Sequence, residues 1–329
     1  MLANDVTILN LEALVPAETT EAADSGQPKV LTIGSALVDI FITSDQFEIT
    51  HGDEEVFSTR SQAGKLSVDS FKLKTGGGGG NTAAGFARLG FAVGCVAELG
   101  TDELAQMVVA DLEKFGVSTQ YLIHERKEET GGSVLLVTPD GDRVALVHRG
   151  AAAQLDPHDI DQLLVMDQDW LHLSSLADQV ETIKEIFKAA RQYQVKLSWN
   201  PGKSELESLV AGQLALADLE VTILFVNSQE WALIEPLHAD LKSQIETIVV
   251  TDGAKGGQII SGDEVTTYEA LKVKAVDTTG AGDSFVVGFV GATLLGHDRL
   301  TAADWGRRNS ASVVQKAGAK QGLLPRDHF

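Results

Sequence analysis

A nine-residue string near the carboxyl end of the sequence has the residue types and spacing to hold a phosphate group. Residues 277–285 read DTTGAGDSF and lead into an apolar run that ends at Leu295. The glycines would let the backbone turn so that successive amide N–H groups point into one cavity. A helix that begins there would add the positive end of its dipole. The string therefore predicts an anion hole formed by Gly280, Ala281 and Gly282.

Asp283 directly follows this hole, and the same amides would stabilise its carboxylate in the ionised form. A carboxylate beside a bound phosphoryl group can accept the proton of an attacking hydroxyl, so Asp283 is our candidate catalytic base. The competing interpretation is structural, with Asp283 as a helix N-cap and the glycines as a tight turn. A bare G-x-G-D favours the structural interpretation, whereas the full nine-residue string favours the catalytic one.

A second string, far upstream, contains the five glycines from Gly76 to Gly80 followed by Asn81. Together the two strings resemble the signatures of the ribokinase-like, or PfkB, family of carbohydrate and nucleoside kinases. A relaxed dinucleotide-binding spacing, G-x-G-x-x-A, is also present from Gly78 to Ala83. The segment before it is a poor buried strand, and no convincing acidic residue ends a following strand where a ribose partner belongs. No Lys followed by Ser or Thr completes a Walker A motif.

The resemblance implies a sugar site built from the second string and from the first predicted strand. Gly76, Gly77 and Asn81 would contact substrate hydroxyls, because a bare backbone permits close approach and an amide both donates and accepts. Asp39 resembles an aspartate of the family that binds sugar hydroxyls, and a carboxylate can accept two such bonds. The alternatives are a flexible hinge capped by Asn81 and a solvated or capping Asp39.

The resemblance also implies an ATP site at the ends of later strands. Thr251 and Gly253 begin a T-x-G-x-x-G string in which the threonine would bond a phosphate. An N-P segment at Asn200 looks like that of ribokinases, although residues 202–204 depart from the pattern and Lys203 is an alternative source of positive charge. The full set of implied ATP contacts is Asn200, Thr251, Gly253, Gly256, Thr279, Gly280, Gly282 and Asn309.

Two cations are implied in the same way. Asn227 and Glu230 resemble the N-x-x-E motif that holds Mg²⁺ partly through water, and Mg²⁺ needs few protein carboxylates because it keeps several waters. Without the flanking motifs this pair would be assigned to a helix start. Asp277 and its neighbours fall where ribokinases bind a monovalent cation, so dependence on K⁺ is a hypothesis.

Alternation of β-branched runs with amphipathic stretches from Val30 onward predicts an α/β fold. The resemblance makes it a Rossmann-like, three-layer ribokinase fold with a mostly parallel central sheet and a small β-sheet lid. Predicted strands are 30–33, 93–97, 170–173, 196–199, 223–226, 247–251 and, before the anion hole, 271–276. Predicted helices are 81–89, 102–115, 180–193, 204–217, 282–295 and 305–316.

The domain plan is a mobile N-terminal tail, residues 1–28, followed by one kinase domain, residues 29–329. Two lid segments, about 42–74 and 130–150, interrupt the alternation of strands and helices. The second reads as a hairpin with its turn at 139–142. A small sheet made from both would cover the ligand cleft at the carboxyl ends of the parallel strands.

The composition of the chain limits the kinds of partner and binding site that we expect. A formal charge of −21 over 329 residues would repel nucleic acid and anionic membrane surfaces. Cys95 is the only cysteine, which excludes disulfides and multi-cysteine metal sites and fits a reducing cytoplasm. The apolar run 285–295 is too short to cross a bilayer, so we expect a soluble protein.

These observations predict an ATP- and Mg²⁺-dependent kinase that phosphorylates a hydroxyl, expected to be a hydroxymethyl, of a small sugar. The first alternative is a nucleoside kinase acting on adenosine or inosine. It is disfavoured because the lid segments are poor in aromatic residues, with only Phe41, Phe47, Phe57 and Phe71. The second alternative is a catalytically silent sugar-binding member. A homodimer is expected, in which paired lids would hide the apolar edge 134–137.

Overall fold

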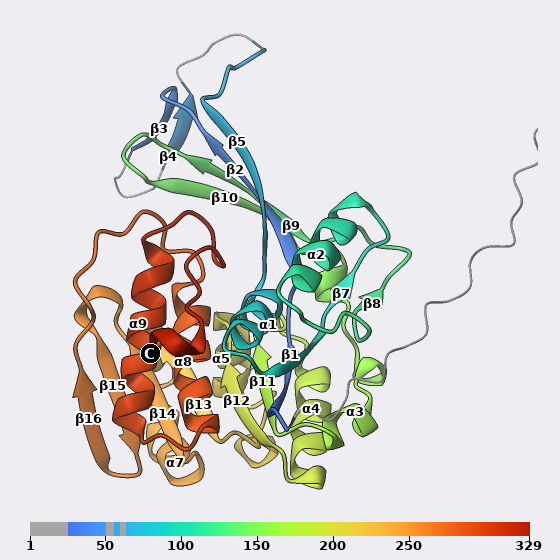
Figure 1. Cartoon of the computed structure of the whole chain (residues 1–329), viewed down its shortest axis with the longest axis vertical. Coiled ribbons are helices and arrows are strands. Elements are labelled where there is room, and N and C mark those ends of the chain that lie inside the picture. The colour runs from blue at the N-terminus through green and yellow to red at the C-terminus, as the bar shows by residue number, and fades with distance from the viewer. Residues whose placement is uncertain (1–25, 51–55, 60–63) are drawn as a thin grey trace, which may run out of the picture.

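The computed structural model describes residues 26–50, 56–59 and 64–329 (Figure 1). Its centre is an eight-stranded sheet with the order β16-β15-β14-β13-β12-β11-β1-β6. Neighbours from β6 to β14 run parallel, and β15 and β16 are antiparallel. The predicted α/β class is therefore confirmed. Residues 1–25 of the predicted tail lie outside the described residues.

The bounds of the elements follow the chain. The central strands are β1 (Lys29–Ile33), β6 (Ala92–Val96), β11 (Trp170–Ser174), β12 (Lys196–Asn200), β13 (Ile223–Asn227), β14 (Thr247–Thr251), β15 (Gly257–Ser261) and β16 (Glu264–Tyr268). The helices are α1 (Gly78–Arg88), α2 (Glu103–Lys114), α3 (Gln162–Met166), α4 (Val180–Tyr193), α5 (Lys203–Val210), α6 (Ser228–Leu233), α7 (His238–Gln244), α8 (Ala281–Leu294) and α9 (Arg299–Val314).

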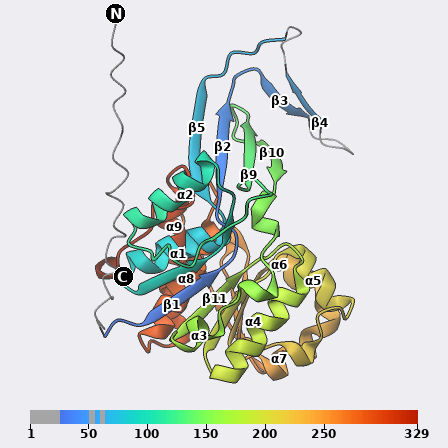
Figure 2. The same cartoon turned by 90° about the vertical axis from the view of Figure 1, so that its right-hand side faces the viewer.

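Helices cover both faces of the sheet, because its central strands are apolar on both sides. Two apolar cores result: one contains side chains of α1, α2, α8 and α9, and the other contains side chains of α3, α4, α5 and α7 (Figures 1 and 2). Helix α8 packs between α1 and α9, which explains why its residues 284–292 are all buried. Its first turn is thereby fixed at the carboxyl ends of the strands.

A second, four-stranded sheet with the order β10-β9-β2-β5 rises from the carboxyl ends of the central strands (Figure 1). It combines β2 (Leu37–Thr43), β5 (Ser70–Gly76), β9 (Gly132–Val137) and β10 (Arg143–His148). The turn between β9 and β10 closes where Gly141 N–H donates to Thr138 O. The pair β3 (Phe47–Thr50) and β4 (Val56–Thr59) lies at its tip, and β7 (Glu98–Leu99) pairs with β8 (Ile123–His124) beside the main sheet.

Several predicted bounds were wrong. Residues 271–276 form no strand; they are exposed coil, and the antiparallel pair β15 and β16 before them was not predicted. Helix α5 ends at Val210 rather than at 217, because Gly212 adopts a left-handed φ of 75°. Helix α1 starts inside the glycine run, at Gly78, three residues before the predicted start.

Every helix in the described part of the chain is too short or too polar to cross a lipid bilayer.

Candidate active site

Asn81 and Asp283, which are 202 residues apart in the sequence, meet at the carboxyl ends of β1 and β11. Asn81 Nδ2 donates to Asp283 Oδ2 at 2.8 Å. A Cβ atom on Gly78 would lie 2.7 Å from Ser174 Cβ and 3.9 Å from Asp283 Oδ1, which places both helix starts over the end of β11. The strand order reverses between β1 and β11, and α/β proteins bind ligands at such crevices.

Glycine is required at the residue before each of these helices. Gly77 has a φ of 88°, and a Cβ there would lie 2.4 Å from Ser35 O. Gly280 has a φ of 75°, and a Cβ there would lie 2.4 Å from Ala319 Cβ. Both are left-handed conformations that other residues adopt only at a cost of about 1–2 kcal/mol. The two glycines thus set the directions in which α1 and α8 present Asn81 and Asp283.

The carboxylate of Asp283 differs in its surroundings from what the sequence predicted. Gly280 is the N-cap of α8, and Asp283 is the third helical residue, so the N-cap interpretation was wrong. Burial raises the pKa of Asp283, while the bond from Asn81 and the charge of Lys320 oppose that rise. Backbone amides do not stabilise its ionised form as expected; Asn81 does so instead. One predicted anion-hole amide, that of Ala281, donates to Thr278 O at 3.2 Å.

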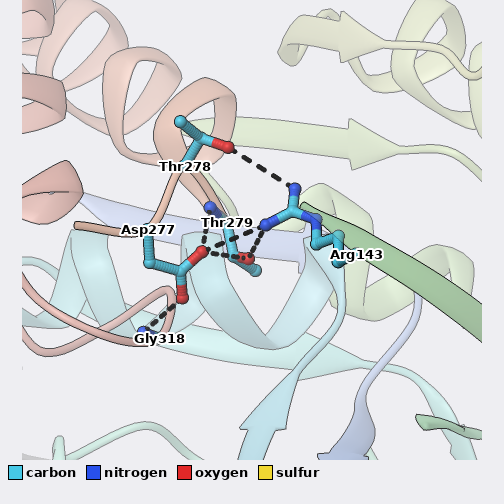
Figure 3. A network of polar contacts seen from close by, with 5 residues as sticks. All are labelled: Arg143, Asp277, Thr278, Thr279 and Gly318. Carbon is cyan, nitrogen blue, oxygen red and sulfur yellow. Dashed lines mark hydrogen bonds and ion pairs between the residues drawn. The ribbon is translucent and has the colours of Figure 1, made fainter. Parts of the chain in front are cut away.

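Asp277 organises the loop before α8 (Figure 3). Its Oδ1 accepts from Thr279 N–H at 2.9 Å and from Thr279 Oγ1 at 2.7 Å, and its Oδ2 accepts from Gly318 N–H at 2.8 Å. Arg143 Nη1, from strand β10 of the second sheet, lies 3.3 Å from Asp277 Oδ1. Burial acts to raise the pKa of Asp277, but these donors outweigh it and hold the pKa below its ordinary value.

Asp39 lies at the base of the second sheet. Its Oδ1 accepts a bond from Ser133, and its Oδ2 lies where a Cβ on Gly76 would come within 2.5 Å. Burial raises the pKa of Asp39, and the bond from Ser133 opposes the rise. A side chain at position 76 would therefore displace the Asp39 carboxylate, a steric role for Gly76 that the sequence had not indicated.

A cavity of about 290 Å³ opens beside the first turn of α8. Its lining includes four residues that the sequence had implied as ATP contacts: Thr251, Gly253, Gly256 and Gly282. Its apolar walls are supplied by Tyr268, Leu271, Val273, Ala275, Phe285, Ala311 and Val314. The arrangement offers an apolar cavity beside a helix N-terminus, which suits a nucleobase joined to phosphates.

A sequence model described as pfkB family carbohydrate kinase matches residues 27–326. The chain belongs to this family. A ribokinase of Staphylococcus aureus is 27% identical over 308 residues, covering 90% of this chain and 96% of that protein. The predicted enzyme class, an ATP-dependent carbohydrate kinase, is thereby confirmed.

Solved structures show the same fold for this pfkB kinase. A nucleoside kinase of Methanocaldococcus jannaschii superposes with a TM-score of 0.75 at 22% identity, covering 91% of this chain and 96% of that one. A ribokinase II of E. coli, solved in complex with ATP and Mg²⁺, superposes with a TM-score of 0.74 at 21% identity, covering 92% and 97%.

Not every predicted contact of the kinase reaches the cavity. Asn309 is fully buried, and its amide donates to Ser284 O at 2.7 Å and accepts from Leu324 N–H at 2.9 Å. Its placement therefore speaks for a structural role and against an ATP contact, whereas the neighbouring Ser310 does line the cavity. Asn200 is also absent from the lining, and its side chain donates to Phe225 O at 3.0 Å.

The pair predicted to hold Mg²⁺ forms a helix start. Asn227 is the N-cap of α6, and Glu230 Oε2 accepts from Asn227 N–H at 2.8 Å in a capping box. Burial raises the pKa of Glu230. Asn227 stands opposite Thr251 across β13 and β14, at the carboxyl edge of the sheet. The pair thus lies at the edge from which the cavity opens, with one carboxylate oxygen outside the capping bond.

Two side chains that the sequence analysis missed contact predicted site residues: Arg143 contacts Asp277, and Ser133 contacts Asp39. A third, Lys320, contacts Thr75 and Asp111 beside the site. Each belongs to a segment without a motif of its own, and Arg143 and Asp277 are 134 residues apart. One signal was available: Arg143 immediately follows the predicted turn at the tip of a hairpin that was expected to fold over the cleft.

Proposed function

We propose that this kinase transfers the γ-phosphoryl group of ATP to a hydroxymethyl group of a small free sugar, with Asp283 as the base. The observation that carries the proposal is the Asn81–Asp283 pair. Asn81 Nδ2 donates to the base, while its buried Oδ1 has no hydrogen-bond donor among the described residues. A buried acceptor without a partner is costly, and a sugar hydroxyl placed beside Asp283 would supply the missing donor.

The residues divide the work of phosphoryl transfer between positioning and charge. Asn81, Asp39, Gly76 and Gly77 would bind the sugar, with the sheet of β2, β5, β9 and β10 acting as a lid that excludes competing water. Asp283 would remove the proton from the acceptor hydroxyl. The amides of Gly282 and Asp283 in the first turn of α8, which have no backbone acceptor among the described residues, would hold developing negative charge.

On the nucleotide side, Thr251, Gly253, Gly256, Thr279, Gly280 and Gly282 are proposed to hold ATP. Asn227 and Glu230 are proposed to hold Mg²⁺ through water, which would neutralise charge on the ATP phosphates. The donor set fits this ion, since a hard cation prefers carboxylate and amide oxygens and Glu230 has one oxygen outside its capping bond. Arg307, which lines the cavity beside α8, is a further source of positive charge on the nucleotide side.

A free sugar is preferred over a nucleoside because the lid offers little aromatic surface. Phe47 and Phe57 pack on each other at the lid tip with ring centroids 5.4 Å apart, and Phe71 is 59% exposed. Phe41 alone of the four candidates lines the groove between the lid and residues 275–278. Stacking of a purine would need a broader aromatic wall.

ADP release measured over ribose, fructose, 2-keto-3-deoxygluconate, adenosine and inosine tests the proposal. We expect turnover with a free sugar and none when Mg²⁺ is chelated. Preference for adenosine or inosine would replace the sugar by a nucleoside. Calorimetric binding of a sugar without ADP release on any of these compounds would identify a catalytically silent member.

We also propose that K⁺ activates the kinase at the loop of Asp277. Because Arg143, Thr279 and Gly318 already surround the carboxylate, the ion would be held mainly by backbone carbonyls of the loop. Turnover is expected to be faster in potassium chloride than in the chloride of a bulky organic cation at equal ionic strength. Equal rates would overturn the proposed activation by K⁺.

A homodimer through the lid is proposed from its exposed apolar edge strands. The sequence analysis predicted that residues 134–137 form this edge. That prediction was wrong, because β9 pairs with β10 on one side and with β2 on the other. The edges are β10, with Leu146 57% and Val147 63% exposed, and β5. Light scattering should give twice the chain mass of 35.0 kDa, and a Leu146→Lys/Val147→Lys variant should give the monomer mass. A monomeric parent protein would contradict this proposal.

We place the protein in the cytoplasm, since the proposed reaction draws on a pool of ATP. The buried, unpaired Cys95 thiol is compatible with a reducing compartment. Cell fractionation that recovers the protein outside the cytoplasm would contradict this location.

A further inference from the structure

Lys320 is a buried cation at the junction of three elements. It lies in the segment after α9, and its side chain is only 5% exposed. Lys320 Nζ donates to Asp111 Oδ2 of α2 at 2.7 Å and to Thr75 Oγ1 of β5 at 2.8 Å. Burying an ammonium group is costly unless it is paired and hydrogen-bonded, so this geometry is held by both partners.

The residues beside each partner belong to the proposed active site. On one side, Gly318 N–H donates to Asp277 Oδ2 at 2.8 Å (Figure 3), and Ala319 packs directly against Gly280. On the other side, Thr75 immediately precedes Gly76, where strand β5 enters the sugar-side glycine run. Lys320 therefore ties the loop behind the anion hole to the base of the lid.

We propose that Lys320 is a positioning residue for phosphoryl transfer, which fixes the segment of Gly318 and Ala319, and with it the loop of Asp277, against the base of the lid. This role rests on the proposed function of Asp283 as the base. Lys320 acts on the reaction through Asp283 and through the loop, without a contact to substrate.

The charges around Asp283 support the electrostatic part. From α1 it faces the neutral amide of Asn81, and from β11 the neutral Ser174. Burial raises the pKa of Asp283, and Lys320 is the one charged side chain of the described residues that appreciably affects this pKa, which it lowers. Lys320 also lowers the pKa of Asp39, whereas Asp277 raises it. Loss of the ammonium charge should therefore leave Asp283 protonated to a higher pH.

The mechanical part depends on Thr75 rather than on charge. Thr75 Oγ1 accepts a hydrogen bond from Lys320 and donates one to Asp111. These three side chains thus form a hydrogen-bonded network at the base of the lid. Removing the Thr75 hydroxyl would loosen the lid stem from the loop and leave the ammonium in place. The effect of the Lys320 charge and the effect of the Thr75 hydrogen bond can therefore be separated by substituting each residue in turn.

A matched control lies in the same region. A cavity of about 330 Å³ is lined by Lys320, Thr75 and Asp111, and also by Lys114 at the end of α2. Lys114 is exposed and, among the described residues, forms no ion pair within 4.0 Å. Lys114→Gln changes the net charge by the same amount as Lys320→Gln, but at a position where water screens the charge.

The test compares pH profiles of kcat/KM for Lys320→Gln, Lys320→Arg, Thr75→Val and Lys114→Gln. Lys320→Gln is expected to move the acid limb to higher pH, since an opposite charge nearby lowers the pKa of a carboxyl group and its loss raises that pKa. Lys320→Arg should restore the limb, and Lys114→Gln should leave it unchanged. Thr75→Val should raise KM for the sugar without moving the limb. An unmoved limb in Lys320→Gln would overturn the electrostatic role, and an unchanged KM in Thr75→Val would overturn the tether.

A carbon NMR titration of the Asp283 carboxyl, assigned with Asp283→Asn, measures the same pKa in protein without substrate. An upward shift in Lys320→Gln supports the inference even if no sugar is phosphorylated, so its failure and that of the proposed function are distinguishable. Should Lys320→Gln not fold, the double variant Lys320→Gln/Asp111→Asn, neutral at both partners, takes its place. A pKa equal to that of the parent in a folded variant would overturn the inference.

Discussion

Asp283→Asn is expected to lower kcat by at least about 100-fold, because an amide cannot accept the proton of the attacking hydroxyl. The substitution is nearly isosteric, and its oxygen can still accept the 2.8 Å bond from Asn81. Sugar binding should therefore survive, so that KM changes far less than kcat. The measurement is ADP release at saturating sugar and ATP, with calorimetry for sugar affinity.

Stability provides an internal check on this variant. Folding raises the pKa of Asp283 above its value in the unfolded chain. The ionised carboxylate thus opposes folding at pH values above the folded-state pKa, and the opposition disappears as the pH falls through that pKa. At neutral pH the melting temperature of Asp283→Asn should equal or exceed that of the parent. Near-normal turnover would falsify the role of Asp283, and a lower melting temperature would contradict the account of its burial.

Asp39→Asn is the matched carboxylate control. Asp39 also has a pKa raised by burial, but it lies at the base of the lid. It is proposed to bind sugar hydroxyls and not to remove the proton of the attacking hydroxyl. Its substitution should act mainly on KM for the sugar. Equal losses of kcat in both variants would mean that the two carboxylates do not have separate roles.

Local sequence patterns predicted the strands and helices whose bounds depend on neighbouring residues in the sequence. The bounds of β14 and α4 were predicted to the residue. A short apolar run indicates a buried strand, and apolar residues repeated every three to four positions indicate an amphipathic helix. Residues 271–276 alternate apolar and charged side chains like a strand, yet no neighbouring strand is there to pair with them. The side chains of Leu271, Val273 and Ala275 line the cavity beside α8 instead.

The meeting of Asn81 with Asp283 was predictable only because two recognisable strings marked both ends of a long-range contact. Nothing comparable marks Arg143 or Lys320, whose partners lie 134 and 209 residues away. A lone cation has no spacing that reveals its partner, so such ion pairs become visible only when the fold brings them together. The same limit explains Asn309, whose position near the cavity was predicted but whose side-chain direction was not.

The two glycines at the start of α8 allow a second strong test, because a methyl group meets different surroundings at each. At Gly280 the φ is 75°, and a Cβ would lie 2.4 Å from Ala319 Cβ and 2.7 Å from Ala319 Cα. The left-handed backbone alone costs about 1–2 kcal/mol, and backbone must also move to relieve the clash. Since Ala319 lies between Gly318 and Lys320, the movement reaches the loop of Asp277 and the base of the lid.

Gly280→Ala is therefore expected to lower the melting temperature by roughly 4 °C or more and to reduce kcat/KM by about 100-fold, through misplacement of the amides. At Gly282 a Cβ would meet no atom within 4 Å, and alanine is the better helix former. Gly282→Ala should keep or raise the melting temperature. Its added methyl would project into the nucleotide cavity, so KM for ATP should rise. A stable Gly280→Ala would show that the helix start tolerates a side chain. An unchanged KM for ATP in Gly282→Ala would mean that the triphosphate does not pass over this turn, and the anion hole would have to be sought elsewhere.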